Sequence, residues 1–210
     1  MKNKETDYIV PIFHRGVFNG TGFIVGNMLI TAAHVVVSEE SLCYFLFGGE
    51  KITIGPDNNM IFEYPKGKEK QGKDNKYWDL AIFQLDNNYS PLELCIPNMT
   101  ESCTYFGFTD STLKVNTYTD VILENHAYYY PPEYEAKPVH IDNCYISVIG
   151  KCTHGNSGGP LFQGNGIVGM LSGGQQWHKF SCDRFIKAEY ILNKIKDYDI
   201  TNPSHKAINK

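Results

Sequence analysis

A serine framed by glycines constrains this chain more than any other stretch of its sequence. Residues 155–160 read Gly-Asn-Ser-Gly-Gly-Pro, which predicts a sharp turn that presents the hydroxyl of Ser157. Glycine adopts backbone angles that other residues avoid, and it lets a second chain approach the main chain closely. Such a turn also aims the backbone N–H groups of Gly155 and Ser157 at one point, where a developing oxyanion can be bound. Taken alone, the stretch is equally consistent with a tight turn between two strands.

A serine hydroxyl acts as a nucleophile only when a base takes its proton and an acid orients that base. The sequence offers a histidine and an aspartate, each at the end of a short apolar segment. His34 follows Thr-Ala-Ala at residues 31–33, and Asp79 opens the run Asp-Leu-Ala-Ile-Phe. A lone histidine in such a place is more often a hydrogen-bonded core residue, and the aspartate could instead cap a strand at a turn. An acid at the mouth of a buried strand needs a partner, because its burial is otherwise costly.

The rest of the chain has the pattern of a β-rich protein. Short apolar segments alternate with turn residues, and aromatic residues make up 13% of the chain, which favours strands. Gly26 and Asn27 form the two-residue turn of a predicted hairpin. The predicted strands cover residues 8–13, 22–31, 45–54, 59–64, 78–85, 103–108, 113–123, 143–149 and 167–171. Ser-Gly-Gly at 172–174 is expected to end the last strand, and the spacing of apolar residues predicts one helix over 185–198.

Four segments in a fixed order carry a family resemblance. They are Gly-Phe-Ile-Val at 22–25, Thr-Ala-Ala-His at 31–34, Asp-Leu-Ala-Ile at 79–82 and the glycine-framed serine at 155–160. Together they resemble the signature segments of trypsin-like (chymotrypsin-fold) serine proteases, from about residue 20 to the C-terminal helix. The resemblance implies an all-β fold of two packed six-stranded antiparallel β-barrels with a C-terminal α-helix. The expected boundaries are 8–92 for the barrel carrying His and Asp, 98–182 for the barrel carrying Ser, 185–198 for the helix and 199–210 for a loose tail.

The same resemblance implies a serine endopeptidase that works through a Ser-His-Asp triad and an acyl-enzyme intermediate. In that reaction His34 takes and returns the proton of Ser157, and Asp79 fixes the tautomer of the imidazole. The N–H groups of Gly155 and Ser157 form the oxyanion hole. Ser172 stands at about the position where the family places a serine that supports the aspartate. The alternative interpretation is a catalytically silent protein-binding module on the same fold.

Substrate recognition is expected at two places. Ser172, Gly173 and Gly174 would form the edge that pairs with an extended substrate backbone, with room left by the glycines. The family's primary pocket is floored by the residue six positions before the serine, which is Lys151 in this sequence. A buried lysine there would favour an acidic substrate side chain, although Lys151 could equally point to solvent. Thr153 and His154 could line the pocket, and His178 is a further candidate. We predict that peptides with an acidic residue before the cut are cleaved faster than those with a basic one.

Several departures from the family pattern are informative. The sequence has no Ile-Val-Gly-Gly-like activation site near the N-terminus, and Asn156 replaces the aspartate that pairs with a newly freed N-terminus in activatable enzymes. We therefore expect a protease that needs no proteolytic activation by that route, as in the bacterial Deg-type, glutamyl-endopeptidase-like and some viral members. No PDZ-like segment follows the helix. No cysteine follows His34 closely, so the common histidine-loop disulfide is missing. Leu171 stands where glutamyl endopeptidases have a histidine, which weakens a glutamate-specific interpretation.

Composition excludes several other functions. A net charge of −4 gives no electrostatic case for nucleic-acid binding. Six cysteines without a C-x-x-C pair lack metal-ligand spacing, so we expect no metal and no cofactor. No run approaches the roughly 18 apolar residues of a membrane span. The polar first residues lack the apolar core of a signal peptide, so we expect a cytoplasmic chain with mostly reduced thiols. The expected partner is a protein or peptide substrate.

Two loops have no assigned role in the expected protease. Residues 66–76 contain five lysines, which suits a solvated excursion and makes a poor site for calcium. Residues 128–134 read Tyr-Tyr-Tyr-Pro-Pro-Glu-Tyr, and they could form either an exposed recognition loop or a packed cover over an open barrel edge.

Overall fold

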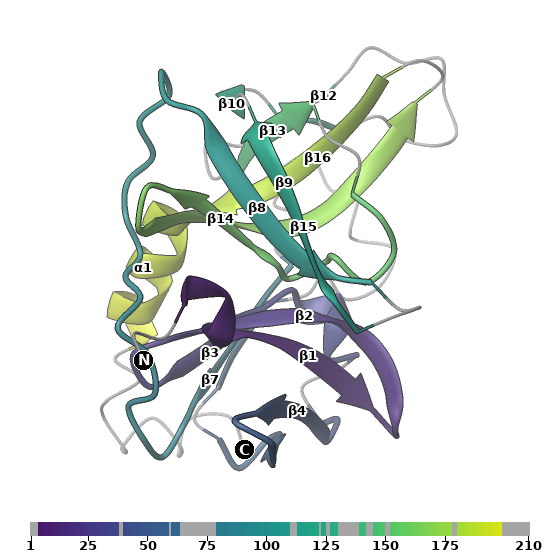
Figure 1. The fold of residues 1–210 in the computed structure, drawn as a ribbon, viewed down its shortest axis with the longest axis vertical. Coiled ribbons are helices and arrows are strands. Elements are labelled where there is room, and N and C mark those ends of the chain that lie inside the picture. Colours follow the sequence, from purple (N-terminus) through teal and green to yellow (C-terminus); the bar gives the residue numbers. More distant parts are fainter. Residues whose placement is uncertain are drawn as a thin grey trace.

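The fold consists of two antiparallel sheets, one above the other, with a helix beside their junction (Figure 1). It is seen in a computed structural model. The described residues are 4–37, 40–58, 60–63, 79–109, 113–121, 123–124, 127–129, 139–141, 145–149, 152–177 and 180–198. Lys151, His178, the 66–76 loop and the 199–210 tail lie outside them.

The first sheet is built from antiparallel strands in the N-terminal part of the chain, mostly paired as hairpins. Its order is β5-β4-β1-β2-β3-β7-β6. The strands are β1 Ile9–His14, β2 Val17–Val25, β3 Met28–Thr31, β4 Cys43–Phe47, β5 Glu50–Ile54, β6 Met60–Glu63 and β7 Leu80–Gln84. Val25 pairs with Met28, so the predicted hairpin turn at Gly26 and Asn27 is confirmed.

The second sheet has the same kind of construction. Its order is β10-β13-β16-β15-β14-β8-β9. The strands are β8 Cys103–Phe108, β9 Val115–Val121, β10 Leu123–Glu124, β13 Tyr145–Ile149, β14 Pro160–Gln163, β15 Gly166–Trp177 and β16 Phe180–Lys187. A separate pair, β11 Ala127–Tyr129 and β12 Val139–Ile141, includes the start of the tyrosine-rich insertion. Residues 130–134 of that insertion lie outside the described part.

The predicted all-β, two-sheet fold with a C-terminal helix is confirmed. Each sheet has seven strands where six were expected. The strands at opposite ends of a sheet, β5 with β6 and β9 with β10, follow each other directly along the chain. Only residue 122 separates β9 from β10. β9 and β10 thus form one interrupted strand, whereas a turn closed by the N–H of Asn58 and the carbonyl of Gly55 separates β5 from β6.

Two predicted boundaries are wrong. Ser172 to Gly174 do not end a strand, because β15 continues through them to Trp177. The helix α1 runs over Ala188–Tyr198 and not from residue 185, because Phe185 and Ile186 belong to β16. Those two residues pair with Leu171 and Met170 of β15, and with β13 on the other side. Long-range pairing overrides the local helical spacing of these apolar residues.

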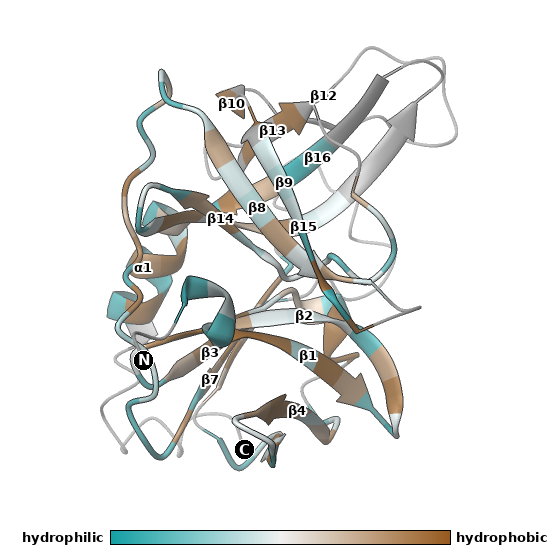
Figure 2. Cartoon of the chain, in the orientation of Figure 1, coloured by the Kyte–Doolittle hydropathy of each residue, from teal (hydrophilic) through white to brown (hydrophobic). Residues whose placement is uncertain are grey.

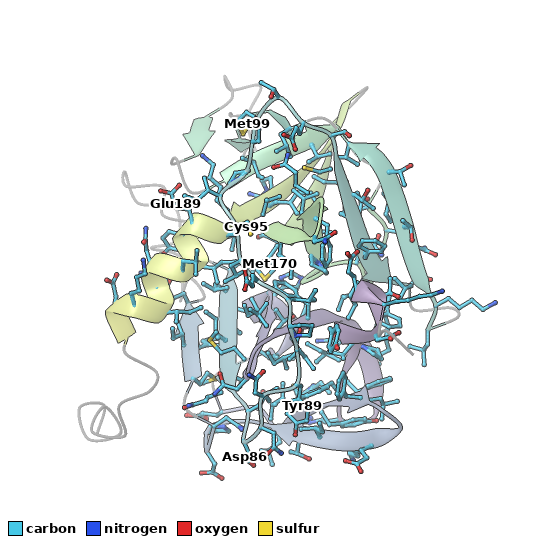
Figure 3. All side chains as sticks on the ribbon, turned by 60° about the vertical axis from the view of Figure 1, so that its left-hand side comes forward. Asp86, Tyr89, Cys95, Met99, Met170 and Glu189 are labelled. Atoms are coloured by element: carbon cyan, nitrogen blue, oxygen red, sulfur yellow. The ribbon has the colours of Figure 1, made fainter. Side chains whose placement is uncertain are left out.

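One apolar core joins the two halves. Hydrophobic residues lie along β1, β3 and β7 (Figure 2). The core cluster that they form also includes Met170 of β15 and Ile191 of α1. The connecting segment passes from Asp86 and Tyr89 through Cys95 to Met99, and the last two pack against the core of the second sheet (Figure 3). Cys95 N–H donates to the carbonyl of Ile167 at 2.8 Å. No helix within the described residues has the length and hydrophobicity of a membrane span.

Candidate active site

The strand ends of the first sheet bring His34 and Asp79 together. β3 ends at Thr31, and His34 follows in the short 3-10 helix η2 (Ala33–Val35). Asp79 immediately precedes β7, which pairs with β3. The backbone N–H of His34 donates to Asp79 Oδ1 at 2.9 Å, and His34 Nδ1 lies 2.8 Å from Asp79 Oδ2. A carboxylate only accepts hydrogen bonds, so Nδ1 carries the proton and Nε2 of the neutral ring is left as an acceptor.

The surroundings of His34 favour its protonated form on balance. Desolvation by burial lowers the pKa of His34, but the hydrogen bond to Asp79 and the negative charge of that carboxylate outweigh it, so the pKa is raised above 6.5. The positive charge of Arg184 acts in the opposite direction. The side chain of His34 is 38% exposed while that of Asp79 is 5% exposed. The imidazole therefore faces solvent from a buried carboxylate that orients it.

A β-bulge in the second sheet supplies a third partner to Asp79. Leu171 pairs with Phe185 and Gly173 pairs with Arg184, so Ser172 is the extra residue between them. A bulge leaves its extra residue out of the ladder and redirects the side chain. The hydroxyl of Ser172 donates to Asp79 Oδ2 at 2.9 Å and is buried. The predicted proximity of Ser172 to the aspartate is thus present in the structure, across the junction of the sheets.

The glycine-framed loop has a defined turn geometry. The N–H of Asn156 donates to the carbonyl of Thr153 at 3.1 Å, which closes a four-residue turn. Gly155, the third residue of this turn, has a φ of 95°, as a type II turn requires. Type I and type II turns differ in the orientation of their central peptide. The φ of Gly155 therefore determines which way its N–H points.

The buried side chain of Asn156 holds this loop on the second sheet. Its Oδ1 accepts from the N–H of Thr153 at 2.8 Å and from the hydroxyl of Tyr118 at 3.1 Å. Its Nδ2 donates to the carbonyl of Phe108 at 2.9 Å. Asn156 is fully buried, and buried amides are costly unless they are satisfied. The loop thus has its own internal support, with no ion pair at Asn156.

The same loop is fastened to the first sheet. The N–H of Thr21 donates to the carbonyl of Ser157 at 2.9 Å. A Cβ at Gly158 would lie 2.0 Å from the carbonyl oxygen of Thr21 and 2.4 Å from Oγ1 of Thr31, and Gly158 has a φ of 84°. Only glycine permits this approach. The Ser157 loop therefore sits against the strands that lead to His34.

The other predicted residues are placed differently. Thr153 and His154 are exposed, and Thr153 supports Asn156. β15 pairs with β14 only as far as Met170, and within the described residues no strand pairs with its opposite edge from Ser172 onward. The prediction that Ser172, Gly173 and Gly174 pair with an extended substrate stays a prediction. Lys151 lies outside the described residues, so the pocket prediction for it stays a prediction.

Sequence reasoning missed the side chains that hold the loops. Asn19, Thr21 and Tyr118 lie far along the chain from their partners, and no local motif signals them. Among the described residues, no group of three or more His, Cys, Asp or Glu side chains could hold a metal ion. The cysteines at 43, 95 and 103 are free thiols.

Comparison with known proteins identifies the family and the fold. A family model described as Trypsin matches residues 2–195. A search of the curated proteins finds no match. Among solved structures, a protease from M. tuberculosis in its active form is 15% identical with a TM-score of 0.66, covering 91% of this chain and 81% of that chain.

Two further structures illustrate the range of the fold. Neuropsin, a serine protease of mouse brain, is 16% identical with a TM-score of 0.63, covering 91% of this chain and 94% of that chain. An inactivated protease paralogue of the scabies mite is 15% identical with a TM-score of 0.64, covering 95% of this chain and 96% of that chain. At these identities the likeness shows the fold alone.

Proposed function

This chain belongs to the trypsin family, and on that premise we propose that it is a serine endopeptidase acting through an acyl-enzyme intermediate. One observation carries the proposal. The carboxylate of Asp79 accepts hydrogen bonds from both the backbone N–H and Nδ1 of His34 and from the hydroxyl of Ser172. The ring of His34 is partly exposed, and a buried carboxylate sets its tautomer. A histidine that served only for packing would need neither feature.

In the proposed reaction, Ser157 Oγ attacks the carbonyl carbon of a peptide bond. Nε2 of His34 takes the hydroxyl proton during the attack and returns it to the leaving amine. Asp79 stabilises the imidazolium that forms between these steps. A water molecule then attacks the acyl-enzyme with the same base, which releases the acid product and restores Ser157.

The tetrahedral intermediate would be stabilised by the backbone N–H groups of Gly155 and Ser157. The type II geometry at Gly155 and the burial of Asn156 support an oxyanion site that exists before substrate binds. We propose on this basis that the protein is active as synthesised, without release of a new N-terminus. The open edge of β15 from Ser172 to Gly174 would pair with the acyl side of an extended substrate.

Labelling with a fluorophosphonate tests the proposal. The unprocessed protein should form a covalent adduct at Ser157, and Ser157→Ala should abolish it while leaving thermal unfolding unchanged. His34→Ala should slow labelling strongly, because the hydroxyl loses its base. An unlabelled wild type that still binds peptides would instead indicate the silent binding module; the scabies mite paralogue of this fold is described as inactivated.

Substrate preference is tested separately. We expect acidic residues before the cut to be favoured through Lys151. Competing peptides that differ only in Glu, Gln or Lys at that position would be followed by mass spectrometry. Equal or reversed rates for Glu and Lys would remove Lys151 from the pocket without affecting the proposed chemistry.

A further inference from the structure

Three successive residues of β2, Asn19, Gly20 and Thr21, contact both loops of the candidate site. We propose that this β2 anchor positions His34 and Ser157 relative to each other, so that Asn19 and Thr21 are positioning residues for the reaction. The inference rests on the proposed function. It assigns the alignment of base and nucleophile to side chains that lie outside every signature segment.

Asn19 holds the histidine turn. Its Nδ2 donates to the carbonyl of Val35, the residue after His34, at 2.5 Å. Val35 ends the 3-10 turn and is fully buried. The sequence lacks a cysteine close to His34, so no disulfide there can hold the turn. The amide of Asn19 therefore provides a direct tie between β2 and the chain segment that carries the imidazole.

Thr21 holds the serine loop. Its N–H donates to the carbonyl of Ser157 at 2.9 Å, and its hydroxyl donates to the carbonyl of Gly155 at 2.7 Å. The same hydroxyl accepts from the N–H of Phe108 at 2.9 Å. Thr21 is fully buried, and its hydroxyl thus joins β2, β8 and the loop. Because the carbonyl of Gly155 is held, the orientation of this end of the turn is held with it.

Gly20 brings the two loops to one point. A Cβ at Gly20 would lie 2.6 Å from the side chain of Val35 and 3.1 Å from the carbonyl oxygen of Ser157. The histidine turn and the serine loop therefore meet over this residue. At Gly20 and Thr21, β2 is also paired with Ile12 and Pro11 of β1. A strand fixed in a sheet is a rigid support, and small misplacements of reacting groups reduce rates strongly.

The test compares Asn19→Ala and Thr21→Val with matched controls. Asn58→Ala also removes an amide that donates to a main-chain carbonyl, that of Gln84. Ser90→Ala also removes a buried hydroxyl, one that accepts from the N–H of Leu92. Neither control residue contacts the candidate site. Thr21→Ser is the conservative variant, since it keeps the hydroxyl.

We expect Asn19→Ala and Thr21→Val to slow fluorophosphonate labelling about 10- to 100-fold at a pH where His34 is neutral. Both controls and Thr21→Ser should stay within about twofold of wild type. All rates are measured well below each variant's unfolding temperature. Wild-type labelling rates in folded Asn19→Ala and Thr21→Val would overturn the inference and leave the proposed function standing.

A second readout does not depend on activity. NMR titration reports the pKa of His34, and amide hydrogen exchange reports the N–H groups of Asn156 and Gly158. Asn19→Ala should lower the His34 pKa toward its ordinary value, because the ring is less well held against Asp79. Thr21→Val should speed exchange at the loop amides. If the wild type is not labelled, the proposed function fails. An unchanged His34 pKa in Asn19→Ala and unchanged amide exchange in Thr21→Val would then overturn the proposed role of the β2 anchor as well.

Discussion

The base and the nucleophile are held in contrasting ways. His34 is oriented by the buried carboxylate of Asp79, which precedes β7 and also accepts from the hydroxyl of Ser172 at the bulge of β15. Ser157 stands on a loop held mainly through its main chain, with the carbonyls of Gly155 and Ser157 bound by Thr21. The difference shows that electrostatics sets the proton affinity of His34, whereas backbone geometry sets the position of the Ser157 loop. Substitutions should therefore separate into those that change proton affinity and those that move the loop.

The largest effect should come from removing the negative charge of Asp79, which orients His34. Asp79→Asn is expected to lower kcat/KM about 10⁴-fold, because the amide no longer fixes the tautomer of His34. The loop should be unaffected, so hydrogen exchange at Gly158 is the control. Near wild-type kcat/KM would show that Asp79 only caps its strand.

This variant should also change the pH dependence. Activity requires neutral His34, so it falls as the pH drops through the raised pKa of that ring. Loss of the Asp79 charge should move this acid limb to lower pH. The same raised pKa means that His34 stabilises the fold below its ordinary pKa and that this contribution is lost as the pH rises through the folded-state value.

The next largest effect should come from the loop. Gly158→Ala places a Cβ against the carbonyl oxygen of Thr21 at a positive φ, and such overpacking costs about 1–3 kcal/mol. The loop can relieve the clash only by moving away from β2, so labelling should fall about 100-fold. The His34 pKa, measured by NMR, should stay raised. A lowered pKa would contradict the separation of the two halves.

A moderate effect is expected at Ser172, the residue of the second sheet that donates a hydrogen bond to Asp79. Ser172→Ala removes one hydrogen bond to a buried carboxylate, an interaction of about 1.5–3 kcal/mol. We expect roughly a 10-fold loss in kcat/KM with KM changed little for short ester substrates. Ser90→Ala is the matched control. An effect on KM alone would assign Ser172 to substrate binding.

The smallest effect should be purely electrostatic. Arg184→Gln removes a positive charge that lowers the pKa of His34, so the acid limb of the rate profile should move to higher pH. The shift should shrink at high salt, because part of the interaction is screened. No shift at low salt would show that Arg184 does not act on His34.

Prediction from sequence succeeded where neighbours along the chain decide the structure. The hairpin turn at Gly26 and β8 over Cys103–Phe108 lie where the pattern placed them. It failed at Ser172, where a bulge allows the strand to continue, and at Phe185, which pairs in β16 and starts no helix. Bulges and strand pairing depend on residues far along the chain, which local periodicity does not contain.

The sequence by itself determined the chemistry available to this protein: a serine on a glycine-framed turn, with one histidine and one aspartate at strand ends. The tertiary structure alone decided that Asp79 meets both His34 and Ser172, and that Asn19 and Thr21 of β2 hold the two loops. The physical reason is that residue types set what a group can do, whereas hydrogen bonds between segments up to 134 residues apart exist only once both sheets have formed and packed together.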